Sequence, residues 1–330
     1  MANSVRTGAF GYLRWGLETT YGTAAVNLNK VFGFEQKITN WSYSNNRVVL
    51  SELNRLFPKT FAYGQARGSI GIDFILSSPW FFELLFDARS STISGAPNTY
   101  NYSISSKAIQ PFTIQVGFDQ TDQDNMRNLQ GCILNTLSLK STVGETVRGS
   151  ADVAYSKEVS TGLTFEPNHP TESDTKHFNF PYTFAHGTLE YPDGTVIAQL
   201  QEVEITFNQN PDLLYSHSSS VATSAYRRLF EVTGRFKASW LDMTQLNKFY
   251  AQIAANSQTL ARTQPTLNLD FNNGLSGDNQ NKIEIKATDI GLGEHTVSGF
   301  EPNEPVFEEI TWQLAGCTVD ISSDVTIPDD

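Results

Sequence analysis

A strand, hairpin, strand and helix pattern occurs twice in this chain, and this repetition limits the folds that the sequence can adopt. The first copy runs from about Ile38 to Ala88 and the second from about Val203 to Ala255. In each copy, alternating apolar and polar residues lead into a long polar hairpin and return through a strand that contains glycine. A short segment of helical period follows. The pattern predicts a mainly β protein in which two similar modules stand in tandem.

The two copies do not align at one constant spacing. Gly68 and Gly234 occupy the returning strands, and Cys132 and Cys317 each stand in a Gly-Cys-apolar context, but the cysteines are farther apart in the sequence than the glycines. An alignment on these residues therefore needs insertions in the second half. Two cysteines in 330 residues do not indicate a disulfide framework. Buried free thiols are the expected state, with a bridge or a reactive thiol as the alternative.

Each copy ends in a predicted short amphipathic helix. In the first copy, Ser77-Ser78-Pro79 provides a hydroxyl cap followed by proline, and an apolar stripe that includes Phe81 and Leu85 comes next. In the second copy, Asp242-Met243-Thr244 precedes a stripe that begins at Leu246. We therefore expect one buried helix beside each hairpin.

The rest of the chain consists of short alternating segments, at the spacing typical of antiparallel hairpins in a β-sandwich or barrel. Residues 1–30 contain several glycines among polar residues, which predicts an extended arm rather than a core strand. The segment at 166–178 is polar and loop-like and is the predicted linker. The predicted organisation is a first domain with the arm at 1–165 and a second domain at 179–330.

Charge and hydropathy exclude several classes of partner. The net charge of −12 disfavours tight binding to nucleic acid and to anionic membranes. The start of the chain lacks the pattern of a secretory signal, and no apolar run approaches the roughly 20 residues of a membrane span. We expect a soluble protein that is synthesised in a cytoplasm and has no membrane partner.

Motifs for catalysis or metal binding are weak. The five histidines lack the spacing of zinc sites. The Asp119–Asn125 segment clusters oxygen atoms but lacks the central glycine and closing glutamate of a calcium loop, so a solvated hairpin tip is favoured. Gly291-Leu292-Gly293 lacks the third glycine of a dinucleotide site and is interpreted as a turn.

Two carboxylate pairs, Glu202 with Glu204 and Glu308 with Glu309, are the candidates for acid–base chemistry. Residues two apart in a strand share a face, so Glu202 and Glu204 should point to the same side, toward solvent or toward one partner. The structural interpretation is favoured for both pairs. We therefore expect no catalytic residues, no cofactor and no metal.

The two hairpin tips present apolar side chains among charged ones, which is costly for a free monomer and usually marks a surface that a partner buries. The alternative is that each tip folds back on its own domain. The candidate contact residues between subunits are Arg47, Val49, Leu53, Leu56 and Phe57 in the first tip and Leu213, Leu214, Tyr215, Tyr226 and Arg227 in the second.

This order of parts resembles the tail tube proteins of long-tailed bacteriophages and related tailed viruses. The resemblance covers most of the chain, and none of its motifs is catalytic. It is carried by the Glu18–Thr23 arm, the two hairpin-helix units, Val232-Thr233-Gly234, and the strand-turn-strand from Leu134 to Tyr155 with its turn at Val143-Gly144-Glu145.

The resemblance implies a structural protein of the virion tail with β-sandwich domains, each flanked by a helix. These domains would form stacked rings whose inner strands close a barrel around a channel. Six domains line such a ring, so three copies of a tandem chain would complete it. Six copies with one domain on the outside are the alternative. The implied partners are the chain itself and the tape measure, terminator and distal tail proteins.

The acidic composition gains a role in such a tube, because a negative channel repels the phosphate backbone and lets DNA pass without binding. Candidates for the channel lining are the alternating polar positions of 37–43, 67–73, 202–208 and 233–239. Two other functions compete with the tube. A carbohydrate-binding or adhesion module would show exposed aromatic side chains at a loop-built pocket, and a hydrolase would show converging carboxylates in a cleft.

Overall fold

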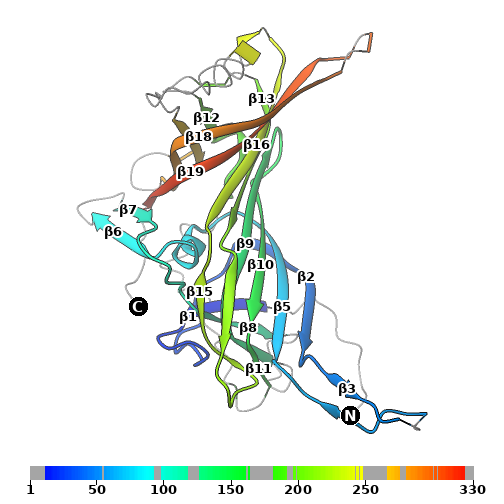
Figure 1. Cartoon of the computed structure of the whole chain (residues 1–330). Helices are drawn as coiled ribbons and strands as arrows, with labels where there is room; N and C mark the ends of the chain where they lie inside the picture. The colour runs from blue at the N-terminus through cyan, green and yellow to red at the C-terminus, as the bar shows by residue number, and fades with distance from the viewer. Residues whose placement is uncertain are drawn as a thin grey trace, which may run out of the picture.

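Strands dominate the computed structural model, so the prediction of a mainly β fold is confirmed (Figure 1). The structure describes residues 12–53, 56–92, 98–117, 126–160, 163, 181–191, 196–197, 199–241, 243–244, 246–247, 266–275, 280–299, 301–302 and 304–323. The predicted linker at 166–178 and the Asp119–Asn125 segment lie outside these ranges.

The elements of the first half are β1 (Tyr12–Leu17), β2 (Phe34–Ser44), β3 (Val48–Leu50), β4 (Thr60–Ala62), β5 (Arg67–Ile75), the 3₁₀ helix η2 (Trp80–Leu84), β6 (Ala88–Thr92), β7 (Asn98–Ser103), β8 (Phe112–Gly117), β9 (Met126–Thr142), β10 (Arg148–Tyr155) and β11 (Lys157–Val159). Those of the second half are η4 (Phe184–His186), β12 (Thr188–Glu190), β13 (Leu200–Asn208), β14 (Pro211–Tyr215), β15 (Ala222–Arg227), β16 (Glu231–Ser239), β17 (Leu267–Asn272), β18 (Lys282–Ser298) and β19 (Phe307–Ser323).

One antiparallel sheet contains strands from both halves, in the order β12-β17-β18-β19-β16-β13-β9-β10-β5-β2. The halves meet where β9 pairs with β13, from Thr136 opposite Asn208 to Thr142 opposite Glu202. Figure 1 shows these long strands side by side along the body of the molecule. β3 with β4 and β14 with β15 form separate two-stranded ladders at the hairpin tips.

The sheet has one apolar and one polar face, because residues two apart in a strand share a face. One row of neighbouring side chains on the apolar face runs across the sheet through Ile38, Ile72, Ala151, Leu137, Phe207, Val232, Leu314 and Ile290. The adjacent row on the opposite face is polar and runs through Lys37, Asp73, Ser150, Ser138, Thr206, Thr233 and Gln313. Burial of the apolar rows against the rest of the chain holds the sheet together.

The first predicted helix exists but is a 3₁₀ helix of five residues rather than an amphipathic α-helix. All five of its side chains are buried, so it has no solvent face that an amphipathic stripe would require. Buried Glu83 is paired with Lys30 Nζ at 3.1 Å and with Arg89 Nη1 at 2.6 Å. The second predicted helix is described only at 244 and 246–247, which are helical. Most of that prediction lies outside the described residues.

Residues of the two hairpins correspond when the sequence is aligned so that Asn46 matches Asn210. We call this constant spacing between corresponding residues the hairpin offset. Both asparagines enter the tips with the same φ of 45°, and the bounds of β5 and β16 follow the same offset. The alignment of Gly68 with Gly234 is therefore wrong. Each glycine instead accommodates its own aromatic neighbour, because a Cβ atom would lie 2.1 Å from the ring of Tyr155 in the case of Gly68 and from Trp312 in the case of Gly234.

The two cysteines are not equivalent either, because Cys132 lies on β9 and Cys317 on β19. Both thiols are free. Burial raises the pKa of Cys132 well above its usual value and that of Cys317 to about 12, so neither is a reactive thiolate near neutral pH.

Two further expectations from glycine patterns are wrong. The N-terminal segment contains β1, which pairs with β8 and has Leu13 and Trp15 buried, and Gly16 within it lets the backbone of Asn27 approach closely. Gly291-Leu292-Gly293 lies inside β18 rather than in a turn, next to an irregularity in the pairing with β19. Glycine in a strand often marks such a bulge or a close backbone approach.

The close contact of Gly234 with Trp312 gives a stability prediction. Gly234→Ala should lower the free energy of unfolding by about 1–3 kcal/mol, because the ring cannot move without disturbing the packed face. Gly291→Ala is the matched control, since the nearest atom to its new Cβ lies 3.9 Å away. Denaturant unfolding of both variants measures the difference, and equal stabilities would contradict the prediction.

Candidate functional site

The first tip, residues 47–63, projects from the body at the end of β2 and β5 (Figure 1). Its apolar side chains face solvent, with Leu53 97%, Leu56 98% and Phe57 80% exposed. Val49 is 47% exposed, and the Arg47 guanidinium lies over the Phe61 ring at 4.8 Å. The first tip thus exposes large apolar side chains close together, which monomeric proteins rarely do.

The second tip, residues 211–227, folds back on its own chain. The hydroxyl of Tyr215 donates to the carbonyl of Ala66 at 3.1 Å, and the amide of Ala66 donates to the carbonyl of Ser220 at 2.6 Å. Tyr226 donates to Asp212 Oδ2 at 2.8 Å, so its hydroxyl is engaged within the hairpin. Leu213 is half-buried and Leu214 is 45% exposed. The tip therefore offers a smaller apolar surface than the first.

Arg227 does not lie on the surface, which corrects its place among the contact candidates. It is 3% exposed, and its Nη2 donates to the carbonyl of Leu85 at 2.5 Å and to Gln209 Oε1 at 3.2 Å. Asp87 Oδ1 lies 3.6 Å from its Nη1. Alternation along β15 turns Arg227 inward, whereas Arg228 is exposed and paired with Asp212. Arg227 thus joins the second tip to the segment after η2.

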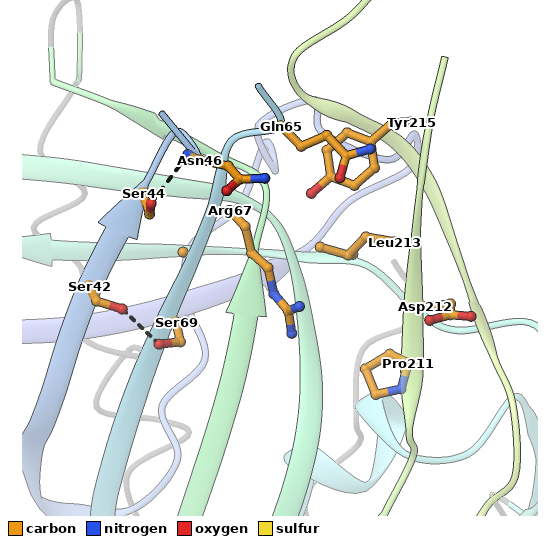
Figure 2. Close-up of a pocket in the computed structure, with 11 residues that line it drawn as sticks. Ser42, Ser44, Asn46, Gln65, Arg67, Ser69, Pro211, Asp212, Leu213 and Tyr215 are labelled. Atoms are coloured by element: carbon orange, nitrogen blue, oxygen red, sulfur yellow. Dashed lines mark hydrogen bonds between the residues drawn. The ribbon is translucent and has the colours of Figure 1, made fainter. Parts of the chain in front are cut away.

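A polar cavity of about 590 Å³ lies between the bases of the two tips. Figure 2 shows the side chain of Arg67, from β5, extending into this space toward β14, which carries Asp212 and Tyr215. The hydrogen bond from Tyr226 and the charges of Arg228 and Arg67 lower the pKa of Asp212. Tyr215 is the only aromatic residue among the described residues of this lining, and its hydroxyl is already bonded to Ala66. The cavity offers little ring surface on which a sugar could stack.

Ion pairs organise the polar face of the sheet around Arg235 on β16. Its guanidinium contacts Glu202 at 2.6 Å, Glu204 at 3.0 Å and Glu309 at 3.1 Å. Lys140 Nζ also lies 3.0 Å from Glu202. Burial lowers the pKa of Arg235, but the hydrogen bonds to Glu309 and Glu204 and the nearby carboxylates raise it overall. One arginine therefore holds three carboxylates in fixed positions.

These pairs test the carboxylate predictions. Glu202 and Glu204 share a face, as the alternation predicts, and both contact Arg235. Glu308 and Glu309 point to opposite faces, since Glu308 is buried and its Oε2 lies 3.3 Å from His295 Nε2. Strand geometry thus separates the second pair. The described residues contain no cluster of three or more metal-ligating side chains.

A family model described as a phage tail tube protein matches residues 8–313. The chain belongs to this family. It is therefore a structural protein of the bacteriophage tail. A search of curated proteins found no match. Within the described residues, no helix has the length and apolar character needed to cross a membrane.

The Glu18–Thr23 segment that carries the resemblance to tail tube proteins has a structural explanation. The buried carboxylate of Glu18 accepts hydrogen bonds from the amides of Gly22 at 2.7 Å and Gly131 at 2.9 Å and from the Thr113 hydroxyl at 2.8 Å. Burial raises the pKa of Glu18, and these bonds oppose that shift. Tyr21 donates to the carbonyl of Gly131 at 3.2 Å. The motif fastens the arm to β9.

The polar face of this tail tube protein includes the predicted lining positions but is not uniformly acidic. Sequence reasoning singled out carboxylates of this face and overlooked its cations, although Lys37, Arg235 and Lys237 lie within the predicted lining segments; Lys140 on β9 and Arg148 on β10 lie outside them. Charged positions of this face include Lys37, Arg67, Asp73, Lys140, Arg148, Asp152, Glu202, Glu204, Glu231, Arg235, Lys237 and Glu309. The charge of −12 is thus not concentrated there.

The contacts of Arg227 predict its effect on stability. Arg227→Ala should lower the free energy of unfolding by about 3 kcal/mol, because it removes the buried guanidinium that faces Asp87 and the carbonyl of Leu85. Arg228→Ala, at the exposed residue directly after β15, is the matched control and should cost far less, since solvent screens its ion pair. Equal losses for the two variants, measured by denaturant unfolding, would contradict the assignment.

Proposed function

We propose that this chain polymerises as stacked rings into the phage tail tube, with the polar face of the sheet around the channel. The supporting observation is the pairing of β9 with β13, which makes one sheet with a single polar face from both halves. β2 is the last strand of that sheet, and within the described residues it pairs with β5 alone. Strands at the end of a sheet are templates for pairing with another chain.

Three copies in each ring fit these features better than six. Both hairpins extend from strands of the same sheet, and the residues with positive φ at which the two hairpins begin correspond by the hairpin offset. In a ring of six chains with one domain on the outside, that domain would not contribute strands to the channel wall. The strands β13, β16 and β19 of the second half continue the wall formed by β9, β10 and β5.

The first tip is proposed as the contact to neighbouring copies and to the adjacent ring. Its exposed Leu53, Leu56 and Phe57 are apolar surface that assembly would remove from water. The chain would also meet tape measure, terminator and distal tail proteins, as expected for a tail tube protein. These partners are proposals that follow from the family.

DNA passage requires a wall that does not hold phosphates. Exposed cations retain DNA through the release of counterions, so the carboxylates around Arg235 have a role in this channel. Glu202, Glu204 and Glu309 already occupy the donors of the guanidinium. The hydroxyl row through Ser138, Thr206 and Thr233 carries no charge. We therefore propose, more specifically, a channel wall in which the charge of Arg235 is neutralised by the three carboxylates around it.

Assembly should depend on the first tip. The triple change Leu53→Ser, Leu56→Ser and Phe57→Ser should abolish rings and tubes in negative-stain microscopy while thermal stability stays unchanged, because these side chains are exposed in the isolated chain. Val26→Ser with Val196→Ser removes exposed apolar surface elsewhere and should leave assembly intact. A wild-type chain that stays monomeric at every concentration would refute the tube function.

Neutralising the carboxylates around Arg235 should make the chain bind DNA. In fluorescence anisotropy with a short duplex at low salt, Glu202→Gln, Glu204→Gln and Glu309→Gln together should produce binding that weakens steeply with salt. As a control, Glu35→Gln, Glu301→Gln and Glu304→Gln together change the net charge by the same amount at exposed positions. This control variant should not bind DNA. Adding Arg235→Gln should abolish the gained binding. Equal binding by both triple variants would show an effect of net charge alone.

A further inference from the structure

The joint between the two halves of one chain is a template for the joint between two copies. From it we infer that β2 of one copy pairs with Glu294–Ser298 of β18 in a second copy, while the first tip docks at Leu229 and Phe230 of that second copy. The inference rests on the proposed tube function and adds the two surfaces and their register.

The first step is the equivalence of β2 with β13. Glu35 lies at the start of β2 and Gln199 directly before β13, with positive φ values of 48° and 55°, and Asn46 and Asn210 follow the two strands with 45°. The hairpin offset relates both pairs. Each asparagine amide also bonds to the side chain two residues earlier, that of Ser44 or Asn208. The chain therefore bends at the same places in both hairpins, and β2 occupies the position of β13.

The second step is the equivalence of β9 with β18. In the first half, β5 ends at Ile75 opposite Arg148, and Arg148 lies opposite Lys140. In the second half, β16 ends at Ser239 opposite Phe307, and Phe307 lies opposite Ser298. Lys140 of β9 therefore corresponds to Ser298 of β18.

These equivalences fix a register between copies. Within the chain, Lys140 lies opposite Glu204 and Ser138 opposite Thr206. By the hairpin offset, Glu204 and Thr206 correspond to Asn40 and Ser42. Between copies, Ser298 should therefore lie opposite Asn40, and Thr296 opposite Ser42.

The faces of the sheet match in this register, which is an independent check because a shift by one residue would invert them. Thr296 lies opposite Glu309 on the polar face, and Ser42 shares that face through its bond to Ser69 at 2.9 Å. Val297 would meet Trp41, and both stand on the apolar side of their strands. The joint would continue both faces from one copy to the next.

The two strand segments are placed for such a contact. β17 covers β18 only over Lys282–Ala287 and so does not occupy Glu294–Ser298. In Figure 1, the β18–β19 hairpin, drawn in orange and red, projects beyond the body at the end opposite to the first tip. β2 lies at the other end of the strand order. Among the described strands, only β19 pairs with β18 at its Glu294–Ser298 end and only β5 pairs with β2, so these two edges can meet different neighbours.

The same equivalence places the first tip. Within the chain, Ser220 of the second tip accepts a hydrogen bond from the amide of Ala66, next to Gln65. By the hairpin offset, Ser220 corresponds to Leu56, and Gln65 and Ala66 correspond to Leu229 and Phe230. Leu56 is 98% and Leu229 is 61% exposed. The contact within the chain, between Ser220 and Ala66, is a polar hydrogen bond. The corresponding contact between copies would instead bury the apolar side chains of Leu56 and Leu229.

Disulfide trapping tests the strand register. In a background with Cys317→Ser, Ser298→Cys and Asn40→Cys should crosslink neighbouring copies in assembled tubes, because opposite residues of antiparallel strands lie within disulfide range. Lys140→Cys with Glu204→Cys is the matched control and should close the equivalent bridge inside one chain. Ser298→Cys with Ser44→Cys is out of register and should not crosslink. On a non-reducing gel, a ring of three predicts products of up to three chains.

The tip contact has its own pair. Leu56→Cys with Leu229→Cys should crosslink copies in the tube, with Gln65→Cys and Ser220→Cys as the counterpart within one chain. If rings form and the control disulfides close within each chain, but the cysteine pairs between copies do not crosslink, this inference is wrong and the tube function still stands. A chain that forms no rings under the microscope would refute both.

Discussion

The pairing of β9 with β13 is the contact on which the rest of the architecture depends. It sets two similar hairpin modules into one sheet, and the alternation of the strands then extends one apolar row and one polar row across both halves. A slip of one residue at this joint would turn every side chain of the second half to the wrong face. The core, the row of hydroxyls and the ion pairs of Arg235 all follow from this single register.

The two hairpins begin alike and end differently. Their entry bends have the same φ at Asn46 and Asn210, but the second tip is fastened by Tyr215, Ser220 and Arg227 to the first half of its own chain. The first tip has apolar side chains in water instead. Two tips in equivalent positions thus have different chemistry: the second makes polar contacts within the chain, and the first exposes the apolar side chains proposed to contact another copy.

Much of this fold could be predicted from the sequence, since period-two alternation gives strands and their faces directly. The shared face of Glu202 and Glu204 and the two long hairpins follow from that alternation. The spacing between the copies could not be read from glycines, because Gly68 and Gly234 are each required by a different aromatic ring. Positive φ at Asn46 and Asn210 determines the bends, and a sequence does not display it. The inward orientation of Arg227 could be predicted only with knowledge of where β15 ends. The 3₁₀ form of η2 could be predicted only with knowledge that all of its side chains are buried.

The covalent connection between the two hairpins also bears on the order in which contacts form. A joint within one chain is held at an effective concentration set by that connection, whereas a joint between copies depends on the concentration of free protein. Contacts of the first kind are therefore complete before assembly begins, and only those of the second kind respond to dilution. The tube would then have two kinds of seam in alternation around each ring, and the seams between chains would open first under strain.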